Sequence, residues 1–309
     1  MYFKLVITII NIIFFYNINL CAQEIKIKYK INNEIITNID IEEEKKYLIF
    51  INPKLKNLSN KDMEILAKNS IIRETIKIKE LKKLLKIKDN YKFLEELENN
   101  LIKKNNFSNK SELVEYLKSK KLKYSQLINK LKFDGLWNQL IYSKFKNSVK
   151  IDKLYLRKKL ELQILNNKKY EYNLSEILFE TSNNENFDEK FSKIKESINM
   201  IGFENTANKY SISNTSNKGG KIGWIKETLL SNDIIKIISK IDVGDFSNPL
   251  PYPNGYLVLK IIEKKEFKQN INIESELKEL IRFETNKQLN QFSLLYYKRL
   301  KQNSTIDEY

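Results

Sequence analysis

The residue types that carry most enzyme chemistry are nearly missing from this chain. Among its 309 residues there is no histidine, and the single cysteine is Cys21. A histidine-based hydrolase and a Cys/His zinc site are therefore excluded. The sequence also lacks an EF-hand spacing of carboxylates and a Walker-type phosphate loop, so we expect neither a metal nor a cofactor.

One run of carboxylates, Glu42 to Glu44, has the composition of an acid cluster. Asn38 or Asp40 can cap a helix that begins just before it. Negative charges are favoured in the first turn of a helix, close to the positive end of its dipole. We therefore expect a solvated first turn and not a catalytic group.

The most informative segment is the glycine cluster Gly-Gly-Lys-Ile-Gly-Trp at 219–224. Six of the seven glycines lie between Gly202 and Gly255, and three of the four prolines lie between Pro249 and Pro253. The rest of the chain consists mainly of Lys, Ile, Asn, Leu and Glu in helical patterns. A turn-rich unit is therefore embedded in a helical protein, and a specific function is expected there.

The pattern before this unit predicts a strand or a hairpin over 26–37 with a turn at Asn32-Asn33, followed by a helix that ends at Pro53. Ser59 and Asp62 resemble a capping box at the start of a long helix. Further helices are predicted over 89–104, 109–119, 123–146 and 152–165.

Inside the unit we predict a strand over 172–179, helices over 187–201, 203–210 and 229–238, a turn at Gly244-Asp245 and a strand over 255–262. Gly202 caps the first helix. A long amphipathic helix over 273–300 follows, and it needs a partner surface, for which the N-terminal helices are the natural candidate. Its apolar stripe is Leu277, Leu280, Ile281, Leu289, Phe292 and Leu295.

The N-terminus has the pattern of a secretory signal peptide. Lys4 is the first charge, and no other precedes Glu24. An apolar run over 5–15 leads to a cleavage site after Ala22. An uncleaved anchor is the alternative, but a span needs ~20 apolar residues. Cleavage removes Cys21, leaves no thiol, and implies a periplasmic protein without a stable membrane span.

The formal net charge of +16 suggests a nucleic-acid or membrane-surface partner. The lysines, however, are mixed with glutamates along the helices. Arginine, which suits bidentate contacts with phosphate, is rare. We therefore expect no nucleic-acid partner and keep this class as the weakest alternative. The arginines are Arg73, Arg157, Arg282 and Arg299.

Five blocks in order resemble the parvulin-type peptidyl-prolyl isomerase domain. The flanks, with 35–40 reading Ile-Ile-Thr-Asn-x-Asp, resemble SurA-type periplasmic chaperones. The blocks are Leu174-Ser175-x-Ile177-Leu178, Phe203-x-x-x-Ala207-x-x-Tyr210-Ser211, Gly219-Gly220-x-x-Gly223-Trp224, Gly244-Asp245-x-x-x-Pro249 and Gly255-Tyr256-x-x-x-Lys260.

This resemblance implies an α+β protein. A mostly helical N-terminal chaperone domain is completed by a long C-terminal helix. The inserted parvulin-like domain has a small antiparallel sheet surrounded by helices. The implied boundaries are 1–22 for the signal peptide, 23–168 for the helical domain, 169–265 for the parvulin-like domain, and 266–309 for the C-terminal helix and tail.

The parvulin pocket holds two histidines, a cysteine or aspartate, and apolar residues that grip the proline ring. Only one of the five matching positions, Leu230, fits this pattern. Trp224 is a further peptide-binding candidate beside Leu230, Ile234 and Leu257. The matching positions are Glu176 and Leu257 for the histidines, Ser213 for the cysteine or aspartate, and Leu230 and Ile234 for the apolar residues.

The resemblance implies a periplasmic chaperone that binds unfolded outer-membrane polypeptides without ATP, with a weak or inactive isomerase pocket. An active peptidyl-prolyl isomerase is the alternative. The sequence leaves the oligomeric state and the identity of the clients open.

Overall fold

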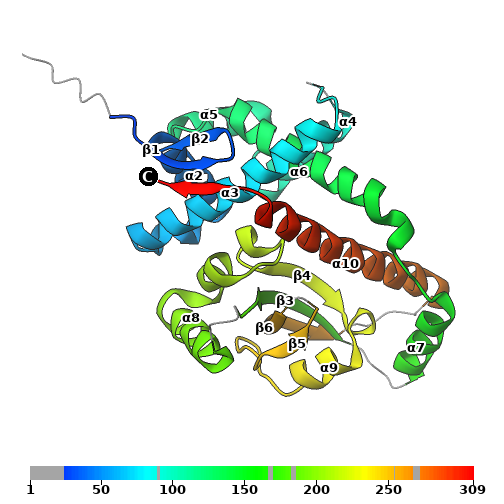
Figure 1. Cartoon of the computed structure of the whole chain (residues 1–309). Coiled ribbons are helices and arrows are strands. Elements are labelled where there is room, and N and C mark those ends of the chain that lie inside the picture. The colour runs from blue at the N-terminus through cyan, green and yellow to red at the C-terminus, as the bar shows by residue number, and fades with distance from the viewer. Residues whose placement is uncertain (1–23, 89–90, 166–169, 182–185, 254, 267–271) are drawn as a thin grey trace, which may run out of the picture.

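The computed structural model describes residues 24–88, 91–165, 170–181, 186–253, 255–266 and 272–309. Figure 1 shows a helical part above and a sheet unit below, with a long helix running between them. The predicted α+β class with small antiparallel sheets is confirmed. The predicted signal peptide lies outside the described residues.

The two ends of the described chain meet in one small sheet. The predicted hairpin is confirmed as β1 (Ile27–Ile31) and β2 (Glu34–Thr37), which turn at Asn32-Asn33. The strand β7 (Ile306–Glu308) pairs with β1 on its other side, so the strand order is β2-β1-β7. The sequence did not predict this three-residue strand, since a strand so short has no visible alternation.

The N-terminal helices are α2 (Asn38–Ile51), α3 (Asn60–Leu84), α4 (Lys92–Lys104), α5 (Lys110–Ser119), α6 (Tyr124–Phe145) and α7 (Lys153–Leu165). The predicted capping box of Ser59 and Asp62 starts α3. Neither of the two predicted caps of α2, Asn38 or Asp40, is its N-cap. Thr37 is the N-cap, and Asp40 is its reciprocal partner in a capping box.

The sequence predicted that the three glutamates at 42–44 are exposed to solvent, and this is wrong for one of them. Glu44 is buried, because α6 lies against this side of α2 and α3. Its carboxylate pairs with Lys130 Nζ at 2.8 Å, and the same amine pairs with Glu74. The half-buried Lys130 thus connects three helices.

The lower unit is an antiparallel sheet in the order β4-β3-β6-β5. Its strands are β3 (Tyr170–Phe179), β4 (Lys221–Lys226), β5 (Leu250–Tyr252) and β6 (Gly255–Glu266). The sequence predicted β3 and a shorter β6. It did not predict β4 and β5, because the glycine cluster and the prolines are typical of turns.

Two helices cover this sheet. On one face α8 (Phe187–Tyr210) packs against Ile177, Phe179 and Val258. It is kinked at Gly202 (φ 82°), the position at which the sequence predicted one helix to end and the next to begin. On the other face lies α9 (Asn232–Ile238), shorter than predicted because 227–229 form a 3-10 turn.

The long helix α10 (Ile273–Gln302) contacts both parts. It packs on α3, α6 and α7, and Phe292 stacks on Phe145 with ring centroids 5.1 Å apart. Leu295 is 48% exposed, which corrects its place in the predicted buried stripe. Phe283 and Leu294 instead pack into the core of the sheet unit. None of the helices in the described ranges is long and apolar enough to cross a membrane.

Candidate functional site

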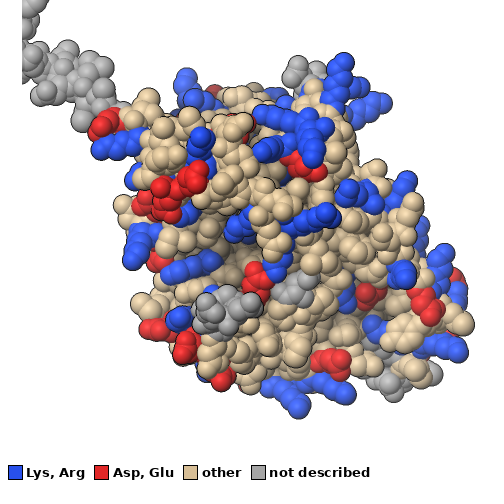
Figure 2. Space-filling view, viewed as in Figure 1, with Lys and Arg blue, Asp and Glu red and all other residues tan. Residues whose placement is uncertain are grey.

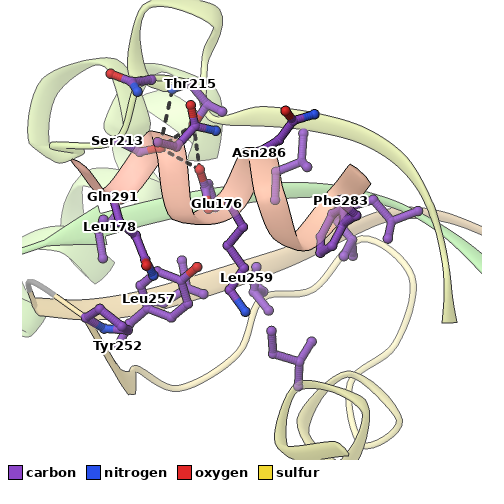
Figure 3. Close-up of a pocket in the computed structure, with 18 of the residues that line it drawn as sticks. Glu176, Leu178, Ser213, Thr215, Tyr252, Leu257, Leu259, Phe283, Asn286 and Gln291 are labelled. Carbon is purple, nitrogen blue, oxygen red and sulfur yellow. Dashed lines mark hydrogen bonds between the residues drawn. The ribbon is translucent and has the colours of Figure 1, made fainter. Parts of the chain in front are cut away.

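A cavity of about 210 Å³ lies between the sheet and helix α10. All five sequence positions that match the parvulin pocket line it. Figure 3 shows that side chains from β3, β6, α10 and the loop before β4 surround this one hollow. These five residues are Glu176, Ser213, Leu230, Ile234 and Leu257.

Glu176 forms the polar corner of the pocket. Its Oε1 accepts hydrogen bonds from Ser213 Oγ at 2.6 Å and from Thr215 Oγ1 at 2.9 Å. Its backbone N–H donates to the carbonyl of Gly220 at 2.8 Å, which joins β3 to the glycine cluster. Burial raises the pKa of the Glu176 carboxyl, although the two hydroxyl donors act in the opposite direction.

This raised pKa makes stability depend on pH. The folded chain keeps the Glu176 proton to a higher pH than the unfolded chain, whose value lies near 4.5. The contribution to stability is therefore lost as the pH rises from there through the folded pKa. In Glu176→Gln this loss disappears, while the amide oxygen still accepts from both hydroxyls.

We expect Glu176→Gln to match the wild type in free energy of unfolding at about pH 4 and to exceed it at about pH 7. Urea denaturation at the two pH values measures this difference. A variant that is less stable than the wild type at the higher pH contradicts this account of Glu176.

The apolar wall is formed by leucine and isoleucine side chains of β3, β6 and the start of α9. Leu257 of β6 is buried and pairs in register with Leu178 of β3. Leu230 is buried just before α9, and Ile234 lies half-buried on that helix. Together these side chains make an apolar slot.

Trp224 does not line this pocket. Its side chain is 43% exposed on β4, and its ring lies 4.2 Å from Lys265 Nζ. The structure therefore separates this residue from the other peptide-binding candidates.

Sequence reasoning missed one whole wall of the pocket, which α10 supplies. Phe283, Asn286 and Asn290 line the cavity, as does Gln291. Gln291 shares the lining of the cavity with Tyr252 of β5, and burial raises the pKa of that tyrosine to about 12. Phe283 carried a usable signal, since it is an apolar residue outside the predicted stripe of its helix.

The arrangement can bind an apolar group but has few means for chemistry. Of the lining residues, Glu176, Tyr252 and Lys287 are ionisable, and Lys287 pairs with Glu284 at 3.6 Å. No group of three His, Cys, Asp or Glu side chains that could hold a metal ion occurs among the described residues.

Residues 173–263 match the family model described as Rotamase: PPIC-type PPIASE domain. These residues carry a PpiC-type domain. The matched segment contains most of β3, all of α8 and α9, and the five pocket positions. It lies inside the predicted parvulin-like range 169–265.

Two curated relatives resemble the chain. It is 30% identical over 108 residues to Chaperone SurA of Pseudomonas putida, which covers 33% of this chain and 25% of that protein. It is 27% identical over 171 residues to Foldase protein PrsA 2 of Bacillus anthracis, which covers 53% of this chain and 56% of that protein. The chain thus matches a quarter and just over half of these relatives' lengths. The predicted resemblance to SurA-type chaperones with a parvulin-like domain is confirmed.

A solved structure of a SurA-like chaperone of Campylobacter jejuni is 21% identical, with a TM-score of 0.38, and covers 92% of this chain and 98% of that one. The structure of PrsA from Bacillus anthracis is 20% identical, with a TM-score of 0.31, and covers 75% of this chain and 93% of that one.

Proposed function

We propose that this chain is a periplasmic chaperone that binds unfolded outer-membrane polypeptides, and that its parvulin-like pocket holds client segments with little or no isomerase activity. In this proposal 23–168 and 266–309 form the chaperone domain and 169–265 the parvulin-like domain. The observation that carries the proposal is the pocket itself. It has an apolar slot, but a carboxylate and a leucine occupy its two histidine positions.

The apolar slot supports binding of an unfolded client. Folded proteins bury most large apolar side chains, so a slot lined by Leu230, Ile234 and Leu257 selects chains that still expose them. A cavity of about 150 Å³ holds a benzene molecule, so the 210 Å³ here has room for one aromatic or proline ring. Strands of outer-membrane barrels are rich in such side chains.

The polar corner supports weak catalysis. The barrier to rotation about a peptide bond is ~18–20 kcal/mol. Lowering it needs a field that favours the twisted amide over the planar one. An ionised Glu176 only accepts hydrogen bonds, and its Oε1 is already engaged by Ser213 and Thr215. It is poorly suited to donate a proton to the prolyl nitrogen of a twisted amide.

The chaperone activity is tested with a urea-unfolded outer-membrane barrel protein diluted into buffer. We expect the mature protein, in several-fold excess, to suppress aggregation measured by light scattering. We expect Ile234→Lys to lose most of this effect, because it places a charge at the slot. Ser239→Lys, at the exposed C-cap of the same helix and outside the pocket, is the matched control. No suppression by the wild type rejects the proposal.

The isomerase activity is tested separately by a protease-coupled assay on a short X-Pro peptide. We expect a rate close to the uncatalysed one. A rate well above it that is lost in Leu230→Lys, while Ser239→Lys retains it, identifies an active isomerase and overturns this part of the proposal.

The surface charge does not favour a nucleic-acid partner. On the face shown in Figure 2, lysines and arginines are spread over both parts and alternate with acidic residues. The affinity for a partner that is bound through its phosphates falls steeply as the salt concentration rises. We expect client binding to change little with salt.

A further inference from the structure

We propose that helix α10 is the second wall of the client site, where Asn286 and Asn290 hydrogen-bond the backbone of an extended client while its apolar side chain fills the slot. This inference rests on the proposed function of the pocket. It assigns a ligand class, an extended unfolded segment recognised by its main chain, and two residues outside the PpiC-type domain that select it.

The position of α10 is fixed at both ends of the pocket. Towards the sheet, Phe283 and Leu294 pack against its core. Towards the helical part, Ser293 Oγ accepts a hydrogen bond from Trp137 Nε1 at 2.9 Å. Since both sides hold the helix, it acts as a rigid wall of the site.

Asn286 and Asn290 have free hydrogen-bonding groups at the mouth of the cavity. Both line the pocket and both are exposed. Neither side-chain amide bonds another group in the described part of the chain. Each amide offers a donor and an acceptor, which are the groups that pair with one peptide unit.

The spacing of the two amides fits an extended chain. Positions i and i+4 lie on one face of a helix, about 6 Å apart along its axis. Alternate residues of an extended strand are separated by about 6.6 Å and point the same way. Asn286 and Asn290 can therefore contact alternate peptide groups of one client strand.

Charge at the mouth agrees with a neutral ligand. Lys287 pairs with Glu284, and the Glu176 carboxylate is turned into the corner with Ser213 and Thr215. The groups left for a ligand are thus uncharged amides and apolar side chains. They complement a peptide backbone with one apolar side chain, and they place no demand on the rest of the client sequence.

The test uses a fluorescein-labelled peptide of alternating aromatic and polar residues without proline, and measures its affinity for the full mature chain by fluorescence anisotropy. We expect the double variant Asn286→Ala/Asn290→Ala to bind about tenfold more weakly, since two hydrogen bonds are lost. Leu295→Ala, an exposed position of the same helix outside the pocket, is expected to bind as the wild type does.

A second peptide, N-methylated on the two backbone nitrogens that face α10, distinguishes backbone recognition from a loss of structure. The wild type should bind it about tenfold more weakly than the unmodified peptide, and the double variant should bind both equally. Equal affinities of wild type and double variant for the unmodified peptide, or tighter binding by the variant, overturn the inference. The proposed function fails separately if Ile234→Lys leaves peptide affinity unchanged.

Discussion

Replacing Gly220 by alanine is expected to destabilise the protein by about 4 kcal/mol and to open the pocket. Gly220 has a φ of 74°, where an L-residue costs about 1–3 kcal/mol. A Cβ there would also lie 2.1 Å from the carbonyl oxygen of Glu176. The backbone must move apart to relieve this contact, at a further cost of about 1–3 kcal/mol. That movement breaks the bond between Glu176 N–H and the Gly220 carbonyl.

Gly223→Ala is the matched control for this change. Gly223 belongs to the same cluster and has a φ of 95°, but a Cβ added there would meet no atom within 4 Å. The Gly223→Ala variant therefore has the backbone strain without the clash. We expect its free energy of unfolding to fall by about 1–2 kcal/mol. Urea denaturation of the two variants measures the difference. Equal losses would show that the close approach to Glu176 is not what requires glycine at 220.

Removing Lys130, whose side chain is 17% exposed, should have a comparable effect on the helical part. Lys130→Met leaves the buried carboxylate of Glu44 and the half-buried carboxylate of Glu74 without their cation. Removing one partner of a buried ion pair lowers the free energy of unfolding by about 3–5 kcal/mol. The deficit should grow as the pH rises towards neutral, because burial already raises the pKa of the Glu74 carboxyl and the folded variant keeps this proton to a higher pH than the unfolded chain does.

Two controls accompany Lys130→Met. Lys123→Met removes a lysine whose side chain is 70% exposed and which lies 3.7 Å from Glu43, so it should change stability by less than about 1 kcal/mol. Adding Glu44→Gln and Glu74→Gln to Lys130→Met should recover much of the loss, because no unpaired charge remains. A loss below about 1 kcal/mol for Lys130→Met itself contradicts the role given to this cluster.

The sequence predicted most helices and the two longer strands of the sheet unit, since each has a strong apolar period. It failed where tertiary contacts decide. β7 forms because β1 offers it an edge, and Glu44 is buried because α6 covers it. Neither partner is visible from local spacing.

The pocket was predictable on one side and not on the other. The five parvulin positions come from elements in a fixed order, so motif spacing was enough to bring Glu176, Leu230 and Leu257 together. The α10 wall is contributed by residues that follow the PpiC-type match. The exposed asparagines of α10 are not part of an apolar repeat, so the sequence pattern does not mark them. They lie at the cavity because Phe283 and Leu294 pack the helix against the sheet unit.

Photo-crosslinking from the pocket tests the central claim most directly. A benzophenone amino acid is placed at Ile234 on the slot, or at Asn199 on the far helix α8, in purified mature protein. Each protein is then mixed with an outer-membrane barrel protein freshly diluted out of urea, and the mixture is irradiated. We predict strong crosslinking to the client from Ile234, little from Asn199, and loss of the Ile234 product when Leu257→Lys blocks the slot in a variant that stays folded by circular dichroism. Crosslinks of equal yield from both positions, or none from Ile234, would contradict the proposal that this pocket holds unfolded chains.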